Sequence, residues 1–142
     1  MEYASHIWGG SSHCNILEKV ESKAFRIICS PFLTESLQPL QVRRIVASLS
    51  LFYRYYNQHC SSELYGRIPP PMRRPRATRL SCSSQRFSVH LSTARLNSYR
   101  DSFMYRSCKV WNSLPNSVFP PYFDLNTFKR RFGLCYDHLL TE

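Results

Sequence analysis

The 142-residue sequence predicts a mainly α-helical protein. Apolar residues recur every three or four positions in four separate segments, the spacing that places them on one face of a helix. Prolines stand near the ends of these segments, where they begin or stop helices. A chain of this length forms one ordinary domain or two small subdomains, which excludes a large multidomain enzyme.

Two amphipathic helices are predicted in the first half of the chain, over about 12–29 and 39–59. Ser11 and Ser12 can cap the first helix, Pro31 ends it, and Pro39 suits the first turn of the second. The two apolar stripes are Leu17, Val20, Ala24, Ile27 and Ile28, then Val42, Ile45, Val46, Leu49, Phe52, Tyr53 and Tyr56. We expect a helical hairpin in which each helix hides the apolar face of the other.

Two further helices are predicted near the C-terminus. The first covers about 99–113, with Ser98-x-x-Asp101 as a capping box and Pro115 as its stop. Asp124 or Asn126 caps the second. Their apolar stripes are Phe103, Ser107, Val110, Trp111 and Leu114, then Leu125, Phe128, Phe132, Cys135, Tyr136 and Leu139. We expect Trp111 to anchor the packing.

The middle of the chain differs from both ends. Pro69-Pro70-Pro71 favours an extended backbone, and the arginine-rich residues that follow offer almost nothing to bury. At 87–91, apolar and polar residues alternate as in a short strand, although no partner strand is identifiable. The predicted division is a helical region at 1–66, a basic linker at 67–98 and a C-terminal helical region at 99–142.

Positive charge is concentrated in this middle part. The chain carries a net charge of +10, and residues 67–109 hold ten basic groups against one acidic group. Nine of the ten are arginines, whose planar fork suits phosphate contacts and base stacking. The basic part is thus either a nucleic-acid contact or a solvated arm. The candidate nucleic-acid-binding residues are Arg43, Arg44, Arg54, Arg73, Arg74, Arg76, Arg79 and Arg86.

The inventory of catalytic groups is thin. The three aspartates lie far apart in sequence, and four glycines cannot form a phosphate-binding loop. Zinc would have to use His13-Cys14, His59-Cys60 or Cys135-x-x-His138, but no Cys-x-x-Cys pair exists. We therefore expect no catalytic residue, metal or cofactor in this chain. No signal peptide or long apolar run is present, so we expect reduced cysteines, an intracellular location and no membrane partner.

Several short strings are more specific than composition. Glu2-Tyr3-Ala4 followed by Trp8-Gly9 resembles the segment after the polymerase palm in reverse transcriptases of non-LTR retrotransposons, the jockey-like and LINE-like elements. The strings at 20–26 and 47–56 resemble the next two helices of that family, and Trp111-Asn112-Ser113-Leu114-Pro115 and 128–132 resemble its C-terminal part. The order of the strings is that of the family. Trp111 and its neighbours are expected to pack in the core rather than stack on bases.

The resemblance implies a thumb-like region at 1–66 and a C-terminal fragment of an RNA-directed DNA polymerase. The chain contains no Asp-Asp, so it lacks the Tyr-x-Asp-Asp palm, which would be expected to use Mg²⁺. Its implied partners are RNA or an RNA/DNA duplex and the missing upstream polymerase domain, in the nucleus. Met1 then suggests a truncated reading frame, a gene-model fragment or a decayed copy. The alternative is a non-catalytic helical interaction module, a relic with a disordered basic arm.

Overall fold

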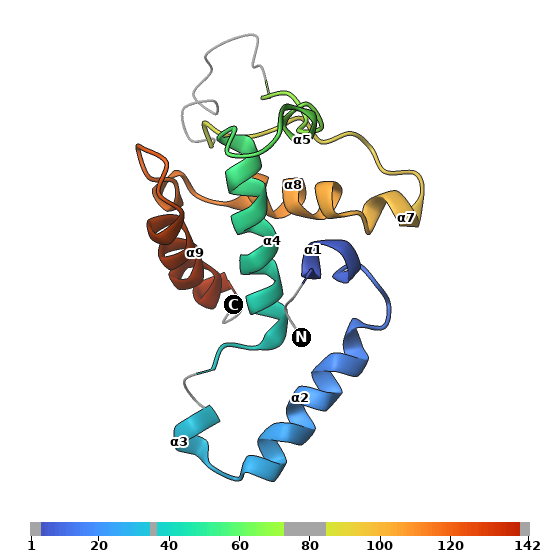
Figure 1. The fold of residues 1–142 in the computed structure, drawn as a ribbon, viewed down its shortest axis with the longest axis vertical. Helices are drawn as coiled ribbons and strands as arrows, with labels where there is room; N and C mark the ends of the chain where they lie inside the picture. Colours follow the sequence, from blue (N-terminus) through green and yellow to red (C-terminus); the bar gives the residue numbers. More distant parts are fainter. Residues whose placement is uncertain (1–3, 35–36, 73–84, 140–142) are drawn as a thin grey trace.

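The computed structural model describes residues 4–34, 37–72 and 85–139, and it confirms a mainly α-helical fold (Figure 1). The elements in chain order are α1 (Ser5–Trp8), α2 (Cys14–Ile28), α3 (Pro31–Thr34), α4 (Leu40–Tyr56), α5 (Ser62–Tyr65), α7 (Asn97–Arg100), α8 (Phe103–Ser113), the 3₁₀ turn η1 (Asn116–Val118) and α9 (Leu125–Leu139). Helices α2, α4 and α8 thus lie within a few residues of their predicted ranges, and α9 begins directly after Asp124, one of its two predicted caps.

Helix α4 is the central element, and α8 and α9 pack against it (Figure 1). Its predicted apolar stripe is confirmed, since Val42, Leu49, Phe52 and Tyr53 are buried. The three helices form one hydrophobic core, to which α9 contributes the buried Phe128 and Phe132. This core takes residues from all three predicted ranges of the chain, because Phe87 and Val89 of the linker pack into it beside the helices.

Aromatic rings fill this core around Trp111. The Trp111 ring is fully buried, and its centroid lies 5.0 Å from that of Phe52 and 4.8 Å from that of Phe119. Tyr53 is stacked between Phe128 and Phe123, at centroid distances of 4.3 and 5.2 Å. The expected role of Trp111 as a packing anchor is confirmed, since a fully buried indole presents no face to a base.

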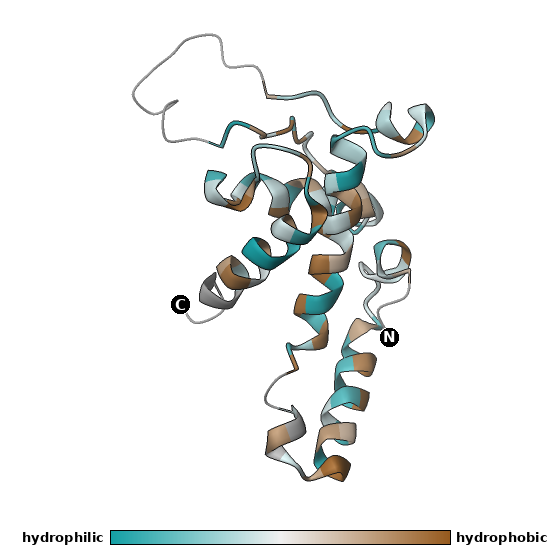
Figure 2. Ribbon diagram, turned by 60° about the vertical axis from the view of Figure 1, so that its left-hand side comes forward, coloured by the Kyte–Doolittle hydropathy of each residue, from teal (hydrophilic) through white to brown (hydrophobic). Residues whose placement is uncertain are grey.

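The predicted hairpin of α2 and α4 is wrong in how its apolar faces are covered. None of the residues of α2 is buried, and Val20, Ile27 and Ile28 are exposed. The two helices meet through ion pairs near the start of α4, and the rest of α2 projects beyond that helix (Figure 2). The physical reason is competition, because the aromatic residues of α8 and α9 already cover the apolar face of α4.

The strand expected at 87–91 does not form. Among the described residues, Val89 makes only an isolated antiparallel bridge to Pro71. On its other side, the side chain of Asn112 occupies the backbone N–H and C=O groups of Val89. A second strand therefore has no free edge to pair with.

The two predicted helix starts near the C-terminus have different outcomes. Ser98 and Asp101 do not form a capping box; they belong to the short α7 and its end, and Ser102 caps α8 by accepting a hydrogen bond from Tyr105 N. Asp124 does cap α9, accepting from the N–H groups of Asn126 and Thr127. Hydrogen bonds, first that from the Thr127 hydroxyl, hold the pKa of Asp124 below its usual value.

Phe128 and Phe123 offer a matched test of the core, because they stack on opposite faces of Tyr53. Phe128 is 1% exposed and Phe123 is 39% exposed. We expect Phe128→Ala to lower the free energy of unfolding by about 3–5 kcal/mol. Phe123→Ala should cost less than about 1.5 kcal/mol, because that ring leaves little cavity behind. Urea denaturation measures both values, and equal losses would contradict the packing described.

Candidate nucleic-acid interface

The arginine-rich part of the linker starts and ends at one place on the core. Met72 N donates to Ser88 O at 2.9 Å, and His90 N donates to Pro70 O at 2.8 Å. Residues 73–84, which we call the arginine loop, lie between these two paired segments and outside the described residues. The linker was expected to separate two lobes; instead, both of its flanks are fixed side by side on a single core.

Two neighbouring side chains of α8 hold this base in place. Asn112 accepts from Val89 N and donates to Val89 O, both at 2.9 Å, so the amide pairs with the backbone as a neighbouring strand would. Trp111 Nε1 donates to Phe87 O at 2.7 Å. Nearby, Arg86 N donates to the Asn116 side chain at 3.0 Å. Trp111 and Asn112 of the Trp-Asn-Ser-Leu-Pro string therefore fix residues 87–89 on the core.

The eight predicted binding residues fall into three groups. Arg73, Arg74, Arg76 and Arg79 lie outside the described residues. Arg54, in the last turn of α4, and Arg86, beside the base of the loop, are both exposed. Their guanidinium groups are open to solvent, as a phosphate contact requires.

Arg43 and Arg44 form the third group, and both are already paired with glutamates of α2. Arg43 is paired with Glu21 at 2.5 Å, and Arg44, only 6% exposed, is paired with Glu18 at 2.5 Å. Glu21 also accepts from Leu40 N at the start of α4, so it caps that helix. The two arginines attach α2 to α4, which helical spacing within α4 alone does not reveal.

Other cations of the described chain are exposed but were not among the predicted binding residues. Arg67, Arg95, Arg100 and Lys109 all belong to the basic stretch of the sequence. Arg106 belongs to the same stretch but is half-buried, and its Nε donates to Asp101 O at 2.8 Å. Charge density along the sequence therefore identifies the basic surface but not the arginine that folds inward.

Groups for metal or thiol chemistry do not converge in the described part of the chain. No cluster of three or more His, Cys, Asp or Glu residues there could hold a metal ion. The His59 ring stacks on Phe123 at 3.7 Å, and Cys14, Cys29, Cys60, Cys108 and Cys135 are free thiols. Burial raises the pKa of Cys108 to about 11, which keeps that thiol protonated and unreactive near neutral pH.

Comparisons with known proteins do not identify a family for this chain. No family model, curated protein or solved structure matches this sequence. As for a bilayer, none of the helices described is both long and apolar enough to cross it.

The Asn112 contact can be tested directly. In Asn112→Ala, the buried N–H and C=O of Val89 lose their partners, and we expect the free energy of unfolding to fall by at least about 2 kcal/mol. Hydrogen exchange at the Val89 amide should accelerate more than at amides in the middle of α9. Asn97→Ala, at an exposed position, is the control. Unchanged exchange at Val89 would show that Asn112 does not hold the base of the loop.

The thiols give a second test. Alkylation by iodoacetamide at pH 8, mapped by mass spectrometry, should modify the exposed Cys29 early and Cys108 only after denaturant is added. The reason is that Cys108 is both buried and protonated at that pH. Rapid modification of native Cys108 would contradict its buried placement.

Proposed function

We propose that this chain is the thumb-like and C-terminal part of a non-LTR retrotransposon reverse transcriptase, and that it binds nucleic acid without polymerase activity of its own. The observation that carries the proposal is that both flanks of the arginine-rich residues 73–84 are fixed on the core, with the exposed Arg86 on one flank. Single-stranded or duplex RNA and an RNA/DNA duplex are the substrates that such a surface suits, through backbone phosphates.

Fixing both flanks lowers the conformational entropy that a basic segment loses when it binds. A free arm loses the conformational entropy of all its residues when it binds, whereas a loop with fixed ends has already lost part of it on folding. Arg54 and Arg86 extend the positive charge onto the described surface, where both residues are exposed. The proposed contacts are therefore Arg54, Arg86 and the four arginines of the loop.

The resemblance supplies the family, its partners and its location within this proposal. The strings at 2–9, 20–26, 47–56, 111–115 and 128–132 stand in the order of the polymerase family. The catalytic palm, its Mg²⁺ and the endonuclease belong to the upstream part of such a protein, and the nucleus is where it acts. Reading the codons upstream of Met1 tests this: an open frame containing Tyr-x-Asp-Asp supports the family, and its absence favours a relic.

A helical protein-interaction module is the second candidate, and the surface of α2 and α3 favours it. Val20, Ile27, Ile28 and Phe32 are exposed, and the end of α2 projects with α3 beyond α4 (Figures 1 and 2). Apolar groups gathered in this way are typical of a surface that packs on another protein. Under this hypothesis the arginine loop only keeps the chain in solution.

A salt titration separates the two candidates. If about five phosphates are neutralised, the logarithm of the affinity for duplex DNA should fall against log salt with a slope of about −4.5. Replacing Arg73, Arg74, Arg76 and Arg79 by Ala leaves Arg54 and Arg86 as the proposed contacts, so the slope should fall in magnitude to about −1.8. The matched control replaces four exposed cations elsewhere, Lys19, Lys23, Arg26 and Lys129, by Ala and should keep the original slope.

Two results would favour the interaction module instead. One is a slope near zero in the unmodified chain, or equal slopes in the two quadruple variants. The other is association that depends on protein concentration and disappears when Val20 and Ile27 are replaced by Gln, because those side chains are exposed on α2.

A further inference from the structure

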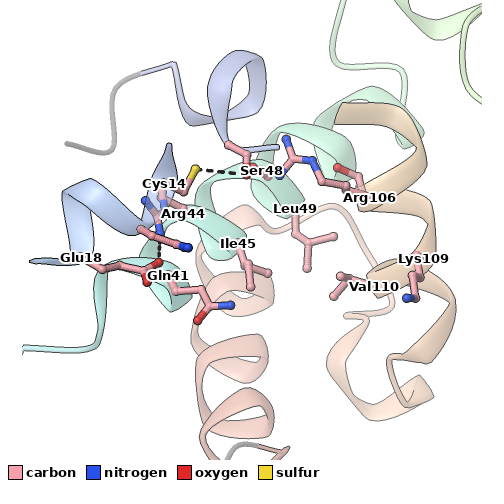
Figure 3. Close-up of a pocket in the computed structure, with 13 residues that line it drawn as sticks. Cys14, Glu18, Gln41, Arg44, Ile45, Ser48, Leu49, Arg106, Lys109 and Val110 are labelled. Atoms are coloured by element: carbon pink, nitrogen blue, oxygen red, sulfur yellow. Dashed lines mark hydrogen bonds and ion pairs between the residues drawn. The ribbon is translucent and has the colours of Figure 1, made fainter. Parts of the chain in front are cut away.

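A cavity of about 340 Å³ lies between the N-terminal turn, α2, α4 and α8, on a part of the molecule that the proposed interface does not use. Arg44 from α4 and Arg106 from α8 both line it, as do Ser48, Ser107 and Lys109 (Figure 3). Two helices distant in sequence therefore bring two guanidinium groups to one hollow. The basic residues of the sequence did not predict this pairing.

Three donors at this cavity have no partner within the described protein. They are Nη1 of Arg44, Nη2 of Arg106 and the hydroxyl of Ser107, and all three atoms are buried. Arg44 is 6% exposed and Ser107 is 3% exposed. A buried donor without a partner costs about 1–3 kcal/mol, and more when it is charged. Three such donors around one cavity indicate a site for a group that accepts hydrogen bonds.

Both arginines are held in position by contacts that leave these donors free. Glu18 pairs with Nη2 of Arg44, whose guanidinium carbon also lies 5.7 Å from the centroid of the Trp8 ring. Asp101 O accepts from Nε of Arg106. Gly10 permits this, because a Cβ there would lie 2.0 Å from that same oxygen. Desolvation lowers the pKa of Arg106, as expected for a cation placed away from water.

The charge of the cavity specifies the class of ligand. Among the lining residues, Glu18 pairs with Arg44, and Arg106 and Lys109 add two further positive charges. The carboxylate of Asp101 acts on Arg106 from outside the lining. A phosphate monoester carries a charge of about −1.5 to −2 at pH 7, whereas a carboxylate or a phosphodiester carries only one negative charge. The volume lies at the small end of ligand cavities, about 300–1,000 Å³. A terminal phosphate with a small organic group matches both.

We propose that this cavity binds a terminal phosphate group through Arg44, Arg106 and Ser107, with Lys109 completing the charge. A phosphate oxygen in the cavity would supply the hydrogen-bond partner that Nη2 of Arg106 lacks. The site does not rest on the proposed function. Its ligand is a free phosphomonoester or the phosphorylated end of a nucleic-acid strand.

Inorganic phosphate is the first probe, titrated into the full chain by calorimetry at fixed ionic strength. We expect saturable binding at one site. Ser107→Ala should weaken binding about threefold to tenfold and leave the melting temperature unchanged or higher, because it removes a buried hydroxyl that has no partner. Arg106→Gln should weaken binding by tenfold or more. Arg95→Gln removes an exposed charge outside the cavity and should change nothing.

Two oligonucleotides that differ only in a 5′-phosphate then identify the source of the phosphate. A preference for the phosphorylated strand that Ser107→Ala abolishes assigns a strand end, whereas equal binding of phosphate and a nucleoside monophosphate, with no strand preference, assigns a free phosphomonoester. The site is refuted if inorganic phosphate does not saturate the chain. It is refuted equally if Ser107→Ala and Arg106→Gln both bind phosphate as tightly as the unmodified protein.

Discussion

Burial of Trp111 is the constraint on which the rest of the structure depends. The indole contacts Phe52 of α4 on one side and Phe119, which follows η1, on another. It therefore sets where α8 crosses α4. Its ring nitrogen needs an acceptor once buried, and Phe87 O is that acceptor. One residue thus joins the helical core to the linker. A linker tied in this way cannot act as a spacer between separate lobes.

The sequence predicted the helices well because each long helix carries its own periodic stripe and its own stop signals. It failed where one segment competes with another for the same surface. The apolar stripe of α2 has helical spacing, yet nothing in that spacing shows that α8 and α9 already cover α4. The expected strand failed similarly, because the partner of Val89 is a side chain, Asn112, and no strand pattern exists to find it.

The same distinction, between signals within one segment and contacts between segments, applies to the candidate site residues. Charge counting identified the basic stretch, and Arg54 and Arg86 are exposed as a binding role requires. Arg43 and Arg44 were also expected to contact nucleic acid. In the structure α2 meets this part of α4, and its two glutamates occupy both arginines. Ion pairs between helices depend on tertiary placement, so sequence patterns within one helix do not contain them.

Helix α2 exposes much of its apolar surface, and polar contacts to α4 hold it in place. Glu21 caps α4 and pairs with Arg43, while Glu18 holds Arg44 beneath the Trp8 ring. These contacts orient α2 through its first half and leave its second half projecting beyond α4 (Figure 1). Because the same Glu18–Arg44 pair borders the cavity between α4 and α8, a ligand bound there would add contacts to the junction that positions α2. The Glu18–Arg44 ion pair therefore has two roles: it helps to hold α2, which carries the exposed apolar stripe, and it borders the cavity.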